Sequence, residues 1–192
     1  SDTICRYYLV PYLNRFHKQF PHVHIKVTNQ TSIACASLLE HGQVDFIVVN
    51  YPNSALSSTH IPRVTNEFPV VFVATRQYFP LDGREVSLAS LQKYPILMLD
   101  RKSTTSEFLH AMFQRSHLDL VPEIELSSND LLIDLARIGL GIAFVPDFCI
   151  PTDDKDLFVV KLKEELPKRQ MVVAYNERMP LSQTAKQFMS ML

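Results

Sequence analysis

Glycine is scarce in this sequence. The chain of 192 residues contains 4 Gly, at positions 42, 83, 139 and 141. Average usage of roughly 7% would place about 13 in a chain of this length. With this spacing, neither G-x-G-x-x-G nor G-x-x-x-x-G-K-[ST] can be written anywhere, and both motifs use glycine to bring backbone N–H groups against a phosphate. The scarcity therefore excludes a glycine-rich nucleotide loop.

An excess of charge and long apolar runs are missing as well. Lys and Arg total 19 against 20 Asp and Glu, a formal net charge of −1, whereas nucleic-acid binding usually needs a basic stripe. No apolar run approaches the roughly 18 residues of a membrane span, and the sequence has no signal-type start. At 46% hydrophobic residues, the chain is predicted to form one large domain or two lobes, without membrane contact.

Cysteine is also rare and unpatterned. Cys5, Cys35 and Cys149 lie far apart and form no C-x-x-C pair. An odd count without pattern is typical of a reducing compartment, so the predicted location is the cytoplasm. Thiols of this kind usually fill the core as small apolar groups. A redox role stays open for Cys5 and Cys35, because each lies near the start of a predicted helix, where the dipole lowers a thiol pKa.

No arrangement of catalytic or metal-binding residues stands out. His22 and His24 are the one close pair among seven His, and no third ligand is evident; solvent-facing positions on an alternating strand explain them as well as metal binding does. H-E-x-x-H and G-x-S-x-G do not occur. The residues alone therefore indicate no catalytic site and no metal site.

Hydrophobic periodicity alternates between helix and strand. Residues 5–20 have helical spacing, Val23–Val27 alternates with period two, and a helix over 33–41 follows. Asp45–Val49 is a continuous apolar strand of the kind found in parallel sheets. Residues 51–66 are expected to be a polar connection. The remaining predicted elements are strands over 69–74, 96–99, 123–126, 141–145, 157–162 and 171–175, and helices over 88–93, from about 105, over 131–138 and over 182–191. The pattern predicts an α/β fold.

Three loops rich in Ser, Thr and Asn follow strands and open helices, at 29–32, 101–105 and 127–129. Helix N-termini carry unpaired N–H groups and a positive dipole end, and open α/β sheets bind ligands beyond the carboxyl ends of their strands. The loops therefore predict a small-anion site, although helix capping alone also explains such residues. Arg101 and Lys102 are either a solvent-exposed pair, or they attract the anion by their positive charge.

Residues Ala136–Pro146 contain the pattern G-x-G-I-A-x-x-P. Other notable segments are Ser1-Asp2-Thr3 followed by Tyr7–Leu13, Phe16 to Pro21 with the V-x-I-x-V strand behind it, Gly42–Ile47, Tyr78–Leu81, and Leu181 to Phe188. Taken in order, these segments resemble the effector-binding domain of LysR-type transcriptional regulators. The similarity covers essentially the whole chain and is most specific at Ala136–Pro146.

The resemblance implies two Rossmann-like lobes of the type 2 periplasmic-binding-protein kind, joined by two crossover strands. Lobe I would comprise residues 1–72 plus 166–192, and lobe II residues 73–165. A winged helix-turn-helix and a linker helix are expected to be absent from this chain, which does not begin with Met. The family also has the first strand of lobe I directly before the position of Ser1.

The resemblance further implies a sensor that binds a small, anionic metabolite between its lobes and thereby controls DNA binding. Such a sensor is not an enzyme, and it is expected to hold no metal and no cofactor. DNA would be contacted only through the missing N-terminal domain. The helices beginning at 33 and near 105 are expected to pair in a homodimer, with a tetramer for the full-length protein. The alternative is a transport solute-binding protein, or an enzyme, on the same fold. Together with the loop analysis, the resemblance predicts these effector-binding residues: Ser1, Thr3, Asn29, Gln30, Thr31, Arg101, Ser103, Thr104, Ser127, Ser128, Asn129 and Phe144.

Overall fold

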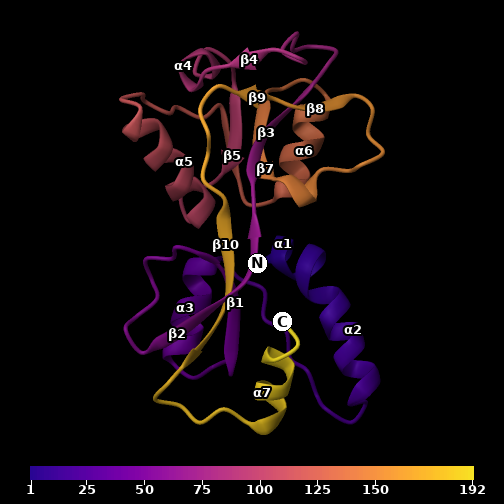
Figure 1. Ribbon diagram of the computed structural model, residues 1–192, viewed down its shortest axis with the longest axis vertical. Coiled ribbons are helices and arrows are strands. Elements are labelled where there is room, and N and C mark those ends of the chain that lie inside the picture. The colour runs from indigo at the N-terminus through magenta and orange to yellow at the C-terminus, as the bar shows by residue number, and fades with distance from the viewer. The chain divides into compact units, whose positions relative to one another are not determined.

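A computed structural model describes residues 1–192, and the chain divides into two compact units (Figure 1). Unit 1 comprises Ser1–Glu67 and Arg169–Leu192, and unit 2 comprises Phe68–Lys168. These limits lie a few residues from the predicted lobe boundaries. Both units combine helices with a sheet, so the predicted α/β class is confirmed.

Unit 1 has a three-stranded sheet in the order β1-β10-β2. β1 pairs with β10 in antiparallel register, with Phe46 opposite Tyr175. The strand β2 lies largely within residues 51–66, which were expected to be a polar connection, so that expectation is wrong. The middle of this strand is largely exposed, so its place in the sheet comes from backbone pairing and not from an apolar pattern. The strands are β1 (Phe46–Tyr51), β2 (His60–Phe68) and β10 (Arg169–Asn176).

The first helical region of unit 1 confirms the helix predicted over 5–20. One turn of it is a π-helix, closed by the Val10 N–H donating to the Cys5 carbonyl, and Pro11 lies in the first turn of the α-helix that follows, where a missing N–H costs little. Figure 1 shows β1 and β10 between α3 on one side and α2 with α7 on the other. The helices are α1 (Asp2–Ile4), η1 (Cys5–Leu9), α2 (Val10–Gln19), α3 (Ser32–Glu40) and α7 (Gln183–Met189).

The strand predicted at Val23–Val27 does not form. This segment belongs to no helix and no sheet, and Ile25 and Val27 are 39% and 52% exposed. An alternating pattern predicts a strand only if another strand is available to pair with it, since the ladder hydrogen bonds lie between strands. The prediction is wrong because no strand of this chain lies beside the segment.

Unit 2 has a five-stranded sheet in the order β6-β5-β7-β3-β8. β5 is parallel to both β6 and β7, whereas β3 is antiparallel to β7 and β8. A separate parallel pair, β4 with β9, lies apart from this sheet. The strands are β3 (Val70–Thr75), β4 (Glu85–Val86), β5 (Ile96–Leu99), β6 (Ile124–Leu126), β7 (Ile142–Pro146), β8 (Leu157–Val159) and β9 (Lys161–Leu162).

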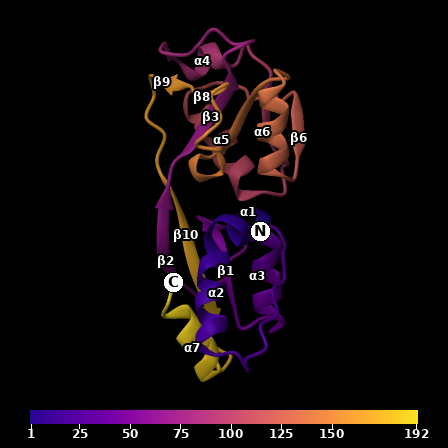
Figure 2. The same cartoon turned by 90° about the vertical axis from the view of Figure 1, so that its right-hand side faces the viewer.

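Helices cover both faces of the large sheet in unit 2 (Figure 2). On one face, Leu132 and Ala136 of α6 pack against Val73 and Ala143. On the other face, Phe108 of α5 lies parallel to Phe144, with ring centroids 6.3 Å apart. The helices of unit 2 are α4 (Leu88–Leu91), α5 (Thr104–Arg115), α6 (Asn129–Arg137) and the 3₁₀ turn η2 (Asp147–Cys149).

None of these helices combines the length and the apolar character that crossing a membrane requires.

Candidate functional site

Two of the predicted loops meet at one edge of the sheet in unit 2. β5 and β6 run parallel, with Leu99 opposite Leu126, so both strands end together. The loop after β5 is joined to the end of β6 by a hydrogen bond of 3.0 Å from the Asp100 N–H to the Leu126 carbonyl. α5 and α6 begin directly beyond these loops, so the structure places two helix N-termini at the carboxyl edge of the sheet, as the loop analysis predicted.

The start of α5 is rich in buried hydroxyl groups. Ser103 caps the helix, its Oγ accepting from the Ser106 N–H at 3.0 Å. Thr104, Thr105 and Ser106 are all buried, and Ser106 is 1% exposed. The Oγ of Ser106 has no hydrogen-bond partner, and neither has the buried Nε2 of His110 one turn further along. Buried polar atoms without partners are rare in folded proteins, so this cluster calls for an explanation.

The start of α6 is a similar but smaller arrangement. The Oγ of Ser128 accepts from the Leu131 N–H at 3.3 Å and caps the helix. Asn129 is buried, whereas Ser127 is exposed. Ser128 and Asn129 therefore join Ser103 and Thr104 at one sheet edge, and Ser127 remains at the rim.

Two other predicted residues of unit 2 have different surroundings. The side chain of Arg101 is 78% exposed, and its Nε lies 4.0 Å from an oxygen of Glu125, so it resembles a solvated ion pair. Phe144 is fully buried, and its ring lies 4.8 Å from that of Phe72 and 6.3 Å from that of Phe108. These contacts give Phe144 a packing role beneath α5.

In unit 1, the start of α3 lies beside the carboxyl end of β1. Thr31 caps α3, its Oγ1 accepting from the Ala34 N–H at 3.1 Å. The buried Ser32 joins helix to strand, because its Oγ accepts from the Asn50 N–H at 3.1 Å and its carbonyl accepts from Asn53 Nδ2 at 2.7 Å. The side-chain oxygen of Asn50 is buried without a hydrogen-bond partner. Unit 1 thus repeats the arrangement of unit 2, with a polar strand end beside a capped helix.

The remaining predicted residues of unit 1 lie at α1 and on the loop before α3. Ser1 caps α1 through its Oγ, which accepts from the Ile4 N–H at 3.4 Å, and Thr3 is half-buried in α1. Asn29 and Gln30 are exposed on the loop that leads to Thr31.

Four residues of these polar arrangements, one arrangement in each unit, were not predicted from the sequence: Ser32, Asn50, Ser106 and His110. Asn50 had a readable signal, because it is the first polar residue after an apolar strand, the same criterion that selected the three loops. Ser32 is the last residue of the predicted loop at 29–32, where the helix cap was expected, and Thr31 caps the helix instead. Ser106 and His110 lie within a helix, where sequence alone does not distinguish a buried hydroxyl from an exposed one.

The three cysteines form no disulfide. Burial raises the pKa of the Cys35 thiol, and this effect outweighs the opposing charge of the N-terminal amino group. The expectation that a helix start lowers the pKa of Cys35 is therefore wrong. Burial also raises the pKa of Cys149, assisted by the nearby charges of Asp130 and Asp147. Both thiols are protonated core groups at neutral pH.

No group of three or more His, Cys, Asp and Glu side chains is arranged to hold a metal ion, and His22 and His24 are both exposed.

Comparison with known proteins gives one consistent family. The LysR substrate binding domain matches residues 1–192. Among curated proteins, the HTH-type transcriptional activator CmpR of Synechocystis is 23% identical over 192 residues, which cover 99% of this chain and 62% of CmpR. The chain therefore spans about three fifths of the length of this relative. The curated relatives are transcriptional regulators, not enzymes.

Solved structures agree in fold. The regulatory domain of Synechocystis PCC6803 CcmR, in complex with 2-PG, superimposes with a TM-score of 0.86 at 19% identity, covering 97% of this chain and 92% of CcmR's. The effector-binding domain of QuiR, in complex with shikimate, gives a TM-score of 0.82 at 14% identity, covering 98% and 90%. The type 2 periplasmic-binding-protein-like fold is thus confirmed, and this chain belongs to the LysR family as its regulatory, effector-binding domain.

Proposed function

We propose that this domain binds a small organic anion that also carries a hydrogen-bond donor, such as a hydroxy acid or an amino acid. The observation that carries the proposal is a pair of buried side-chain oxygens without partners, Ser106 Oγ at the start of α5 and Asn50 Oδ1 at the end of β1. A hydroxyl donates to an anion, whereas an amide oxygen accepts from a ligand hydroxyl or ammonium group. Both oxygens lie beside helix starts, where negative charge is favoured.

The predicted residues that support this proposal fall into one set in each unit. In unit 2 they are Ser103, Thr104, Ser128 and Asn129, with Ser127 and Arg101 at the rim. In unit 1 they are Ser1, Thr3, Asn29, Gln30 and Thr31. That a single ligand contacts both sets, in a site between the lobes, stays a prediction that variants in each unit can test.

The first experiment is a thermal-shift screen. Sulfate, simple carboxylates, hydroxy acids and amino acids are added singly, and the midpoint of unfolding is recorded. The proposal expects a hydroxy acid or an amino acid to raise the midpoint more than the matched acid that lacks the donor. Equal stabilisation by the matched acids would contradict the role assigned to Asn50.

The second experiment changes Ser106 to Ala and measures the affinity of the best ligand by calorimetry. A hydrogen bond to a charged group contributes about 1.5–3 kcal/mol, so binding should weaken about tenfold or more. Stability without ligand should stay the same or rise, because the lost hydroxyl has no protein partner. Ser87→Ala is the control for affinity, since it removes a serine hydroxyl at the start of α4; because Ser87 caps that helix, its loss should lower stability by about 1 kcal/mol and leave the affinity unchanged. Unchanged affinity in Ser106→Ala would overturn the unit 2 site.

A third variant tests both units together. Thr31→Val combined with Ser103→Ala should abolish the ligand-induced rise in the unfolding midpoint. Each change removes a helix cap and costs about 1 kcal/mol of stability, so Ser182→Ala, which removes the cap of α7, controls for the loss of a cap. A ligand shift that survives the double variant would contradict the site.

We extend the proposal to the whole protein. Effector binding would favour one arrangement of the domain and so change the placement of an N-terminal DNA-binding domain. The proposed homodimer pairs through α3 and α5, the full-length protein is a tetramer, and the protein acts in the cytoplasm. Light scattering of the domain and of the full-length protein, with and without ligand, measures the two assemblies.

A further inference from the structure

Helix α5 carries two buried polar atoms that no protein group satisfies. Ser106 Oγ and His110 Nε2 each lack a hydrogen-bond partner, so they also do not bond to one another. The two residues are four apart on one helix, which places their side chains on the same face with Cβ atoms about 5–6 Å apart. Buried polar atoms are normally hydrogen-bonded. A single chemical group lying between these two side chains would satisfy both atoms at once.

Both side chains can donate to that group. Ser106 is 1% exposed and lies in the first turn of α5, where its own N–H donates to Ser103 Oγ at 3.0 Å. His110 is half-buried one turn further along. A hydroxyl donates through its rotatable hydrogen, and an imidazole donates from Nε2 in its Nε2–H tautomer and in its charged form. The first turn of a helix favours negative charge. The pair therefore offers two donors to one anionic group.

The neighbouring charges limit how much negative charge that group can carry. The side chain of Arg101 is 78% exposed, and its Nε lies 4.0 Å from an oxygen of Glu125. Lys102 is exposed as well. The basic residues of the loop before α5 thus lie in solvent, and the buried donors belong to a hydroxyl and an imidazole. Burying charge is costly unless it is paired, so a group with one negative charge fits better than one with two. A carboxylate has a single charge and two oxygens that accept hydrogen bonds.

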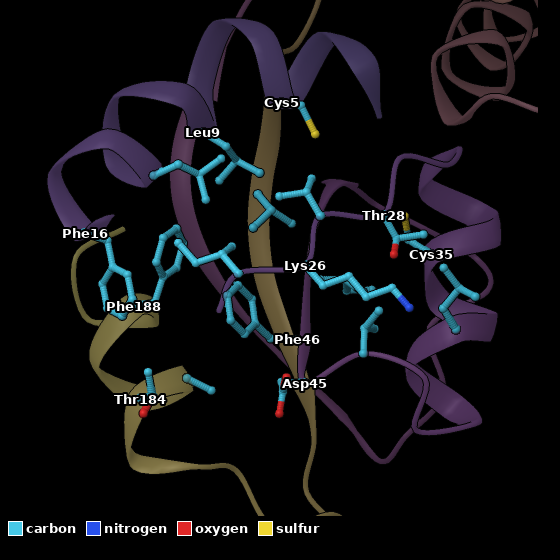
Figure 3. A pocket seen from close by; sticks show the side chains of 18 of the residues that line it. Cys5, Leu9, Phe16, Lys26, Thr28, Cys35, Asp45, Phe46, Thr184 and Phe188 are labelled. Atoms are coloured by element: carbon cyan, nitrogen blue, oxygen red, sulfur yellow. The ribbon is translucent and has the colours of Figure 1, made fainter. Parts of the chain in front are cut away.

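Unit 1 contains a cavity of about 460 Å³ whose chemistry is different. Figure 3 shows Leu9, Phe16, Phe46 and Phe188 on one side of it and Lys26 on the other. Lys26 is an exposed residue, and none of the buried side-chain atoms without partners lines the cavity. An acid group placed there would have one solvated ammonium group and a largely apolar wall. The cavity therefore fits an acid group less well than the start of α5 does.

From this we propose that Ser106 and His110 together bind the carboxylate of the effector, each donating to one of its two oxygens. The inference rests on the proposed function, which assigns an organic anion to Ser106, and it adds the second binding residue and the class of acid. His110 is then a specificity-determining residue. A ligand in which one carboxylate oxygen is replaced by an amide nitrogen leaves one of the two donors without an acceptor, and an unsatisfied buried donor is costly.

The probes are four acids with their amides: glycolate, lactate, glycine and serine. The acid that raises the unfolding midpoint most is then titrated by calorimetry into the wild-type protein and two variants. His110→Phe keeps a ring of similar size without a donor, and binding should weaken about tenfold or more. His110→Gln places an amide N–H near the position of Nε2, and its affinity should stay within about threefold of wild type. If His110 acted only by packing, the order of the two variants would be reversed, because Phe preserves the ring and Gln does not.

The amide of the same acid supplies a matched ligand. Wild type should bind the acid about tenfold more tightly than the amide, and this ratio should fall in His110→Phe because the second donor is gone. Lys26→Ala is the matched control in the unit 1 cavity, and it should leave the affinity unchanged. Without ligand, His110→Phe should be as stable as wild type or more stable, since Nε2 has no protein partner.

Three results separate the two levels of the proposal. Binding that weakens in Ser106→Ala but not in His110→Phe would overturn the role of His110 and leave the proposed function in place. Binding that neither variant weakens would overturn the proposed function as well. A loss of affinity in Lys26→Ala, with His110→Phe unchanged, would place the acid group in the unit 1 cavity and so contradict the assignment to α5.

Discussion

Gly141 precedes β7 where two backbones approach closely. A Cβ at this position would lie 2.6 Å from the carbonyl oxygen of Pro95 and 2.7 Å from Cδ2 of Leu97. The same carbonyl accepts from the Ile142 N–H at 2.8 Å, at the start of the β5–β7 pairing. Glycine at 141 is therefore required for space, and its φ is not in the left-handed region.

Gly141→Ala is expected to lower the free energy of unfolding by about 2 kcal/mol, because overpacking of this kind typically costs about 1–3 kcal/mol. The measurement is urea denaturation. Gly83→Ala is the control: Gly83 has φ +73° but open space around a Cβ, so only backbone strain of about 1 kcal/mol is expected. A loss at Gly141 no larger than that at Gly83 would contradict the steric explanation.

At the scale of the elements, one ion-pair network ties α6 to the turn before β8. Arg137 Nε donates to Asp154 Oδ2 at 2.7 Å, and Arg137 also pairs with Asp134. Asp154 Oδ1 accepts from the N–H groups of Asp156 and Leu157 at 3.0 and 3.3 Å. The hydrogen bond from Arg137, more than the others, holds the pKa of Asp154 below its usual range.

Asp154→Asn is expected to cost about 1 kcal/mol of stability at pH 7, a modest value because Arg137 is partly exposed. A carboxyl whose pKa falls on folding stabilises above its unfolded pKa of about 3.9, and this contribution is lost as pH falls through the lower folded value. The difference between variant and wild type should therefore shrink below about pH 3.9.

Thermal melts between pH 2 and pH 7 measure that difference. The exposed pair of Glu85 and Lys161 supplies the control, and Glu85→Gln should not change the melts measurably. A difference for Asp154→Asn that grows on acidification would have the wrong sign for this network.

At the scale of the whole chain, each unit has its own apolar core. Leu39 of α3 packs with Ile47, Val49 and Val172 in unit 1. Leu132 of α6 packs with Val73, Leu97 and Ala143 in unit 2. Truncation of a buried leucine to alanine typically costs about 2–5 kcal/mol.

We expect Leu39→Ala to speed amide exchange mainly in β1 and β10, and Leu132→Ala mainly in β5 and β7. Hydrogen exchange read by mass spectrometry separates these peptides, and each variant serves as the control for the other. Equal acceleration in both units by either variant would mean that the cores do not open separately.

Local chemistry was the predictable part of this protein. The loops at 29–32, 101–105 and 127–129 were predicted to open helices, and Thr31, Ser103 and Ser128 within them each cap one, because a cap joins atoms only three residues apart. Two predictions, a strand at Val23–Val27 and a polar connection in place of β2, were wrong for the opposite reason. Strand pairing depends on residues far away in the sequence, which an alternating pattern does not specify.

The candidate site, too, was predicted only in part from the sequence. The sequence by itself determined most of the helices, their caps and, through motif spacing, the LysR family, since each depends on residues close together in the chain. Only the tertiary structure decided that Ser106 and Asn50 keep buried oxygens without partners, that Phe144 lies in the core and that burial raises the pKa of Cys35. Burial and hydrogen-bond satisfaction are properties of neighbours brought together by folding, so they appear only when distant segments have been placed beside one another.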